Sequence, residues 1–85
     1  MKQIGICGAG QMGAAAAVSF QRAGYPVLLW ARNADKHPAI RQTVADLDAW
    51  LNKHVGEPGG ATASTELVND LSLIDDRADL IMDAI

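Results

Sequence analysis

Residues 6–13 read ICGAGQMG, a G-x-G-x-x-G pattern between an apolar segment at 4–7 and an alanine-rich segment that follows. In such a context Gly8 allows a tight turn out of a strand, and Gly10 lets the backbone approach a pyrophosphate. Gly13 lets the next helix pack closely on the sheet. The N-terminus of that helix favours a bound anion. The pattern predicts a dinucleotide site made of Gly8, Ala9, Gly10, Gln11, Met12 and Gly13.

The segments around the glycines complete one strand–helix–strand unit. A helix is expected over 11–23, and Gly24 ends it. Its buried face is predicted to hold Met12, Ala16, Phe20 and Ala23. The apolar run VLLW at 27–30 is typical of a parallel strand that is buried on both faces. The whole unit fits within roughly 30 residues, the usual length of a βαβ unit, which favours a nucleotide site over an isolated glycine turn.

A second amphipathic helix is predicted after this unit. Apolar residues recur there at helical spacing and mark one core-facing stripe. The stripe consists of Ile40, Val44, Leu47, Leu51 and Val55. Asp35 and Pro38 supply start signals, and Lys53, His54, Gly56 and Pro58 supply stop signals.

The remainder of the chain predicts two more strands. A short third strand is expected over 63–68, followed by a helix that Asp70 or Ser72 caps and that runs to about Arg77. An apolar fourth strand, expected to be buried, follows over 79–85. The elements together predict an α/β fold of three layers, αβα, with a parallel sheet of about four strands. This is part of a doubly wound domain, because a second mononucleotide-binding half has no counterpart in the sequence.

Composition and charge argue against several other classes of protein. Apolar residues make up 49% and charged residues 20% of the 85 residues, and no apolar run approaches the about 18 residues of a membrane span. The first strand begins too early to leave room for a signal peptide, so a cytoplasmic location is expected. The net charge is −3 and the basic residues are scattered, which argues against nucleic acid as a partner.

The cysteine and the histidines predict neither catalysis nor metal binding. Cys7 is the only cysteine, so the chain has no internal disulfide, and the thiol is expected to pack as a small apolar group. His37 and His54 lie near opposite ends of the second predicted helix, 17 positions apart. They are interpreted as polar residues of the helix ends.

Three stretches resemble the N-terminal domain of 3-hydroxyacyl-CoA dehydrogenases: IGICGAGQMG at 4–13, AGYPVLL at 23–29 and ADLIMDAI at 78–85. The resemblance implies a Rossmann-type fold, an NAD(P) cofactor, and hydride transfer between nicotinamide and a 3-hydroxyacyl or 3-oxoacyl thioester in fatty acid metabolism. Glycerol-3-phosphate dehydrogenases and the 6-phosphogluconate and 3-hydroxyisobutyrate dehydrogenase group share this plan. Their resemblance to the chain is shorter and includes LWARN at 29–33.

The resemblance also implies that residues 1–85 are a partial dinucleotide-binding domain of a larger enzyme. In the resembled enzymes the catalytic residues come after the fourth strand and in a helical second domain, and none has a counterpart here. The 85 residues are therefore expected to be inactive alone, while the intact parent binds an acyl-CoA-type substrate and forms a homodimer. The alternative is a non-catalytic dinucleotide-binding or interaction module that is complete at this length.

The end of the second predicted strand departs from an NAD site. Such sites usually place an acidic residue about 20 residues beyond the glycines, where it binds the ribose hydroxyls. Here Ala31 is followed by Arg32 and Asn33. A guanidinium fits a 2′-phosphate, and the missing acid removes a repulsion that would reject NADP. The sequence predicts a preference for NADP through Arg32, assisted by Lys36 or Arg41.

Overall fold

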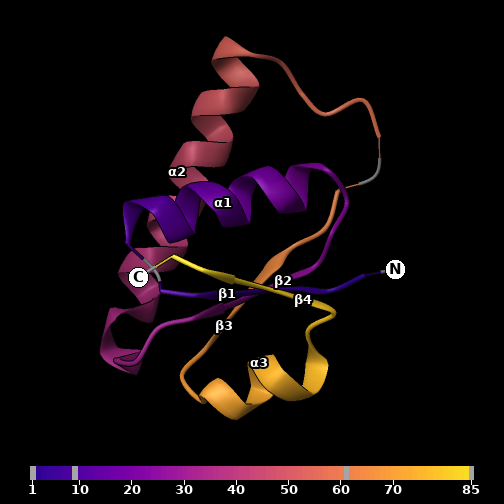
Figure 1. Ribbon diagram of the computed structural model, residues 1–85. Helices are drawn as coiled ribbons and strands as arrows, with labels where there is room; N and C mark the ends of the chain where they lie inside the picture. The colour runs from indigo at the N-terminus through magenta and orange to yellow at the C-terminus, as the bar shows by residue number, and fades with distance from the viewer. Residues whose placement is uncertain (1, 9, 61, 85) are drawn as a thin grey trace.

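The chain forms a parallel β-sheet with helices on both faces (Figure 1). The computed structural model describes residues 2–8, 10–60 and 62–84. Along the chain lie β1 (Ile4–Cys7), α1 (Gln11–Arg22), β2 (Val27–Trp30), the 3₁₀ turn η1 (Ala34–Lys36), α2 (His37–His54), β3 (Thr65–Val68), α3 (Leu71–Arg77) and β4 (Leu80–Asp83). The predicted α/β fold with αβα layers is confirmed.

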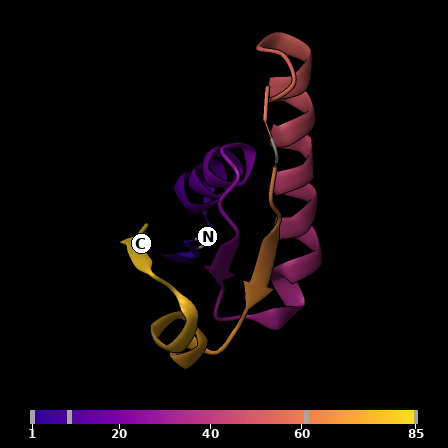
Figure 2. The ribbon, with the colours of Figure 1, turned by 90° about the vertical axis from the view of Figure 1, so that its right-hand side faces the viewer.

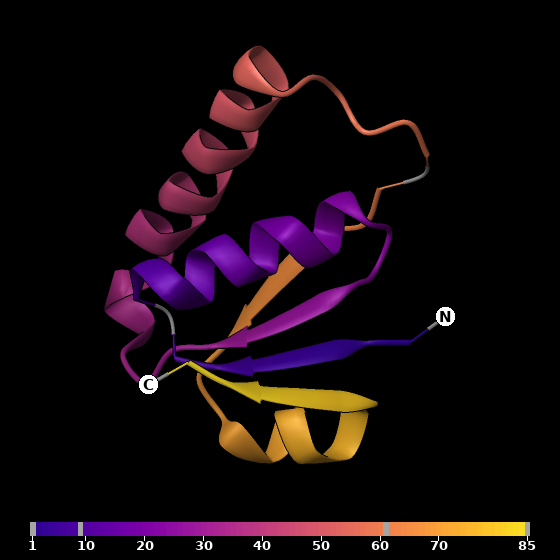
Figure 3. The same cartoon turned by 45° about the horizontal axis from the view of Figure 1, so that its top comes forward.

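Within the described residues the sheet has four strands in the order β3-β2-β1-β4. All neighbouring pairs are parallel, and Ile6 of β1 lies opposite Leu29 of β2 and Met82 of β4. The carboxyl ends of the strands therefore meet at one edge of the sheet (Figure 3). The strand order reverses between β1 and β4, and in sheets of this kind ligands bind at the carboxyl edge beside such a reversal.

The helices cover the two faces unequally. α1 and α2 pack against each other on one side of the sheet, and α3 lies on the other side (Figure 1 and Figure 2). Two apolar clusters fill the space between sheet and helices. The cluster under α1 and α2 consists of Ile4, Ile6, Ala14, Ala17, Val18, Val27, Leu29 and Val44. The cluster under α3 consists of Leu28, Val68 and Ile74.

The predicted buried face of α1 is partly wrong. Met12 is 75% exposed and Ala23 is exposed, whereas Ala16 and Phe20 pack partly against the core. The buried residues of the helix are Gly13, Ala14, Ala17 and Val18. The physical reason is the contact between Gly13 and the backbone of Gly8, which turns the smallest residues toward the sheet.

Two further expectations about burial are corrected. Val55 is 74% exposed because it caps the C-terminus of α2 and lies beyond its last turn. The other residues of the predicted stripe are buried or pack against the core. The apolar side chains of β4 are also exposed, because this strand lies at the edge of the sheet. Among the described residues, no helix combines the length and apolar character needed to cross a membrane.

Candidate functional site

The glycine turn joins the centre of the sheet to the start of α1. Gly8 has φ 108°, a conformation that side-chain-bearing residues rarely adopt. Its N–H donates to the Trp30 carbonyl (3.1 Å), and the Gly10 carbonyl accepts from the Ala14 N–H (2.9 Å). The turn is thus held by β2 on one side and by α1 on the other. Ala9, which is also predicted to bind cofactor, lies outside the described residues.

Gly10 and Gly13 differ in their surroundings. A Cβ on Gly13 would collide with the carbonyl oxygen of Gly8, so this glycine permits the close approach of α1 to the turn. A Cβ on Gly10 would have no described neighbour within 4 Å. Gly10 therefore faces open space, on the side from which a ligand can approach the backbone.

The start of α1 is suited to an anion. Gly10 caps the helix without a side-chain hydrogen bond, and the described first turn contains no acidic residue. The first N–H groups of a helix have no partner within it, so an oxyanion can accept them, with support from the helix dipole. The exposed side chains of Gln11 and Met12 lie at this end of α1 rather than in the core.

A hollow of about 440 Å³ extends from the glycine turn to the end of β2. It brings together predicted residues from both places and adds two that were assigned to the core. Its lining consists of Gly8, Gly10, Trp30, Ala31, Arg32, Asn33, Lys36 and Ile40. None of these described lining residues is acidic. The hollow has the place and charge expected for the adenosine half of a dinucleotide.

The structure places the two basic residues predicted to assist Arg32, Lys36 and Arg41, in different hollows. Lys36 lies at the end of η1 and lines the same hollow as Arg32. Arg41, one turn further along α2, lines a different hollow with Val44 and Thr65. Ile40 was missed because its spacing marks it only as a core residue. It packs partly against the core and also borders the hollow.

The loop after β2 is held by its own polar groups. The Asn33 Oδ1 accepts from the Asp35 N–H (3.0 Å), and the Asn33 carbonyl accepts from the Lys36 N–H (3.1 Å). Asn33 therefore acts as the N-cap of η1. The sequence placed Asn33 only at the end of the second strand and did not indicate this capping role. Arg32 and Lys36 are exposed, so their charges face solvent at the mouth of the hollow.

Cys7 is partly buried on the α3 side of the sheet. Burial raises the pKa of its thiol above the ordinary value, and the carboxylates of Asp83 and Asp75 raise it further. A raised pKa keeps the thiol protonated near neutral pH, which disfavours nucleophilic chemistry. The packing role expected for Cys7 agrees with this environment. The described residues contain no cluster of His, Cys, Asp and Glu suited to a metal ion.

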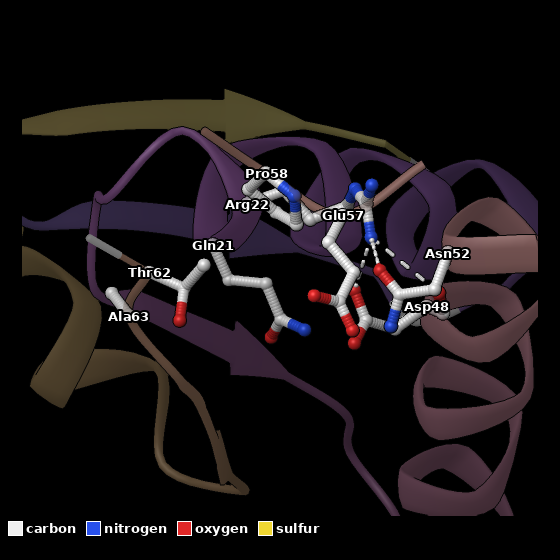
Figure 4. A pocket seen from close by; sticks show the side chains of 8 residues that line it. All are labelled: Gln21, Arg22, Asp48, Asn52, Glu57, Pro58, Thr62 and Ala63. Carbon is white, nitrogen blue, oxygen red and sulfur yellow. Dashed lines mark hydrogen bonds and ion pairs between the residues drawn. The ribbon is translucent and has the colours of Figure 1, made fainter. Parts of the chain in front are cut away.

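A second hollow, of about 300 Å³ and lined mainly by polar side chains, lies at the opposite end of α1 (Figure 4). Arg22 spans it, donating to the Asp48 Oδ1 (3.0 Å), the Asn52 Oδ1 (2.7 Å) and the Gly56 carbonyl (2.6 Å). The guanidinium is thus occupied by partners from α2 and from the loop that follows. These hydrogen bonds of Arg22 join α1 to α2, and the hollow lies at the other end of α1 from the glycine turn.

Comparison with known proteins gives three findings. A family model described as the NAD binding domain of 3-hydroxyacyl-CoA dehydrogenase matches residues 3–85. The chain is 43% identical over 49 residues to a glycerol-3-phosphate dehydrogenase [NAD(P)+] of Idiomarina loihiensis, a match that covers 58% of this chain and 14% of that protein. A solved diketoreductase, described as acting on dicarbonyl compounds, matches all of this chain and 32% of its own, with TM-score 0.84 and 22% identity. That likeness shows the fold.

Proposed function

We propose a function from the premise that the chain belongs to the 3-hydroxyacyl-CoA dehydrogenase family, as the NAD-binding domain of that family. It is an NAD-binding dehydrogenase domain with a Rossmann-type fold. We propose further that it binds the dinucleotide at the carboxyl edge of the sheet and prefers NADP(H) to NAD(H).

The proposed binding mode uses the two ends of the 440 Å³ hollow. The pyrophosphate lies on the glycine turn and the first turn of α1, at Gly8, Ala9, Gly10, Gln11, Met12 and Gly13. Adenosine lies along Ala31 and Ile40, which supply an apolar wall. The ribose then lies beside Arg32 and Asn33, at the strand end that usually binds it.

One observation carries the cofactor preference: Arg32 and Lys36 line the hollow, and no described lining residue is acidic. A guanidinium pairs well with a phosphate, whereas ribose hydroxyls are usually held by a carboxylate. An acidic residue here would repel the 2′-phosphate, so its absence supports the same preference. The similar glycerol-3-phosphate dehydrogenase of Idiomarina loihiensis is described with NAD(P)+, which is compatible with NADP(H) as the cofactor of this chain.

We also propose that the domain serves a larger oxidoreductase. This enzyme would move hydride between nicotinamide and a 3-hydroxyacyl or 3-oxoacyl thioester, with catalytic groups and homodimer contacts in a helical domain outside these 85 residues. The cofactor supplies the hydride chemistry, and the domain supplies binding and orientation. The 85 residues alone would then bind cofactor without turnover. The family match over residues 3–85 supports the proposal.

The identity of 43% over 49 residues favours glycerol 3-phosphate as a second candidate substrate. The two enzyme proposals differ in the substrate that the complete protein reduces with NADPH. Acetoacetyl-CoA is expected to be turned over in the first case and dihydroxyacetone phosphate in the second. Turnover of neither would leave the 6-phosphogluconate and 3-hydroxyisobutyrate dehydrogenase group and a non-catalytic dinucleotide-binding module as the alternatives.

The cofactor proposal is tested by calorimetry on the chain with 2′-phospho-ADP-ribose and ADP-ribose, which carry only the half of the cofactor that reaches Arg32. The phosphorylated probe is expected to bind more tightly. Arg32→Ala should remove a charge-assisted contact of about 1.5–3 kcal/mol, roughly ten- to a hundredfold in affinity, for that probe alone. Arg32→Asp should reverse the preference.

The matched control is Arg41→Ala, because Arg41 lines a different hollow. It should leave both affinities unchanged. Tighter binding of ADP-ribose by the unmodified chain, or equal losses of both probes in Arg32→Ala, would contradict the NADP preference while leaving the dinucleotide site in place.

A further inference from the structure

His37 is a buried polar residue whose role the sequence did not reveal. It is 8% exposed at the start of α2, and it is the one buried polar side chain among the described residues. Burying a polar group is unfavourable unless it finds a hydrogen-bond partner. The partner is close: His37 Nε2 lies 3.2 Å from the carbonyl oxygen of Ala31.

The chemistry of this contact fixes its direction. A carbonyl oxygen can only accept, so His37 Nε2 must carry the proton and donate it. The Ala31 N–H donates in turn to the Val68 carbonyl of β3 (2.9 Å). Both polar backbone groups of Ala31 are therefore held, one by the sheet and one by α2.

The contact closes the loop that carries the two cations of the candidate site. The Ala31 carbonyl belongs to the peptide unit that leads into Arg32, and Lys36 immediately precedes His37. Fixing that carbonyl to the imidazole thus holds both ends of the segment 31–37. Within the segment, Asn33 bonds to the N–H groups of Asp35 and Lys36.

We infer that His37 is a positioning residue, which holds the loop so that Arg32 and Lys36 converge on the 2′-phosphate of the cofactor. The inference rests on the proposed function. His37 touches no ligand in this scheme. It acts by restricting the loop before binding, which lowers the ordering cost that the bound phosphate would otherwise have to offset.

The test compares His37→Leu, which keeps bulk and removes the donor, with His37→Gln, which keeps an N–H donor. In His37→Leu the affinity for 2′-phospho-ADP-ribose should fall about two- to tenfold, the range of one hydrogen bond, with little change for ADP-ribose. His37→Gln should restore most of the loss. The matched control is His54→Leu, because His54 Nδ1 contacts the Trp50 carbonyl (2.9 Å) at the far end of α2.

Equal losses of both probes in His37→Leu, or no loss in a folded variant, would overturn the inference. A second measurement needs neither ligand nor substitution: nitrogen NMR of the unmodified chain should show a protonated Nε2 on His37, with slow exchange of the Lys36 amide. An unprotonated Nε2 would overturn the inference even where His37→Leu fails to fold. Failure of the unmodified chain to prefer the phosphorylated probe would instead reject the proposed NADP preference.

Discussion

Gly10 and Gly13 have the same side chain and stand three positions apart, yet they serve different purposes. Gly13 is needed by the fold, because a Cβ there would meet the backbone of Gly8. Gly10 is not needed by the fold: its φ of −71° and ψ of −167° suit any residue, and the space beside it is open. We propose that its value lies in letting a phosphate reach the backbone.

This contrast predicts opposite effects of two matched substitutions. Gly13→Ala should lower the free energy of unfolding by about 1–3 kcal/mol, the usual cost of overpacking, because α1 must move away from the turn. Gly10→Ala should leave the free energy of unfolding within about 0.5 kcal/mol of its original value, as for ordinary surface changes. Urea unfolding measures both quantities.

Dinucleotide affinity, unlike stability, is expected to depend directly on the absence of a side chain at Gly10. Gly10→Val, whose side chain enters the space assigned to the pyrophosphate, should abolish binding while circular dichroism reports an intact fold. Normal affinity in this variant would reject the phosphate role of the glycine turn, and a stable Gly13→Ala variant would reject the packing role of Gly13.

At the scale of elements, local signals predicted most of the structure. Gly24 has φ 94° just after α1, and Pro38 lies in the first turn of α2, so the helix boundaries followed from residues with restricted or unusual backbone preferences. The rotation of α1 could not be predicted from apolar spacing, because the contact of Gly13 with Gly8 decides it.

The residues of the candidate site were predictable only where they belong to a recognisable sequence motif. The glycine pattern and the strand end at Arg32 were both visible in the sequence, and the structure brings Gly8, Gly10 and Arg32 to one hollow. Lys36 and Arg41 could not be ranked, because only the path of the chain through η1 places Lys36 beside Arg32. The buried contact of His37 with the Ala31 carbonyl likewise depends on the folded loop.

The cap of α3 gives a prediction with a defined pH dependence. Asp70 Oδ1 accepts from the Ser72 hydroxyl (2.8 Å) and from the Ser72 N–H (3.0 Å). These bonds, the hydroxyl one first, lower the pKa of Asp70 below its ordinary value. A carboxyl with a lowered pKa in the folded state stabilises the fold above its unfolded-state pKa, and this contribution is lost as pH falls through the folded-state pKa.

Asp70→Ala should therefore reduce stability at pH 7, and the difference from the unmodified chain should shrink as the pH falls below the ordinary pKa of Asp. Urea unfolding at several pH values measures this difference. Asp76→Ala serves as control, because Asp76 is an exposed acidic residue within α3 rather than at its cap. A difference that grows as the pH falls would contradict the capping role of ionised Asp70.

At the scale of the whole molecule, two polar or charged regions lie at opposite ends of α1 and differ in their surroundings. The carboxyl edge of the strands carries the glycine turn, the loop after β2 and the hollow between them. The opposite end of α1 is bound to α2 and the following loop through Arg22. The matched segments span 14% of the glycerol-3-phosphate dehydrogenase and 32% of the diketoreductase.

The most direct test of the central claim is an NMR titration of the ¹⁵N-labelled chain with NADPH. Saturable shifts are expected for the amides of Gly8, Gly10, Gln11, Arg32 and Lys36, all fitting one dissociation constant. The amides of Asp48 and Asn52, at the hollow that Arg22 spans, should stay unchanged and serve as the internal control. Shifts confined to Asp48 and Asn52, or no saturable shift at the glycine turn, would contradict the assignment of the dinucleotide site.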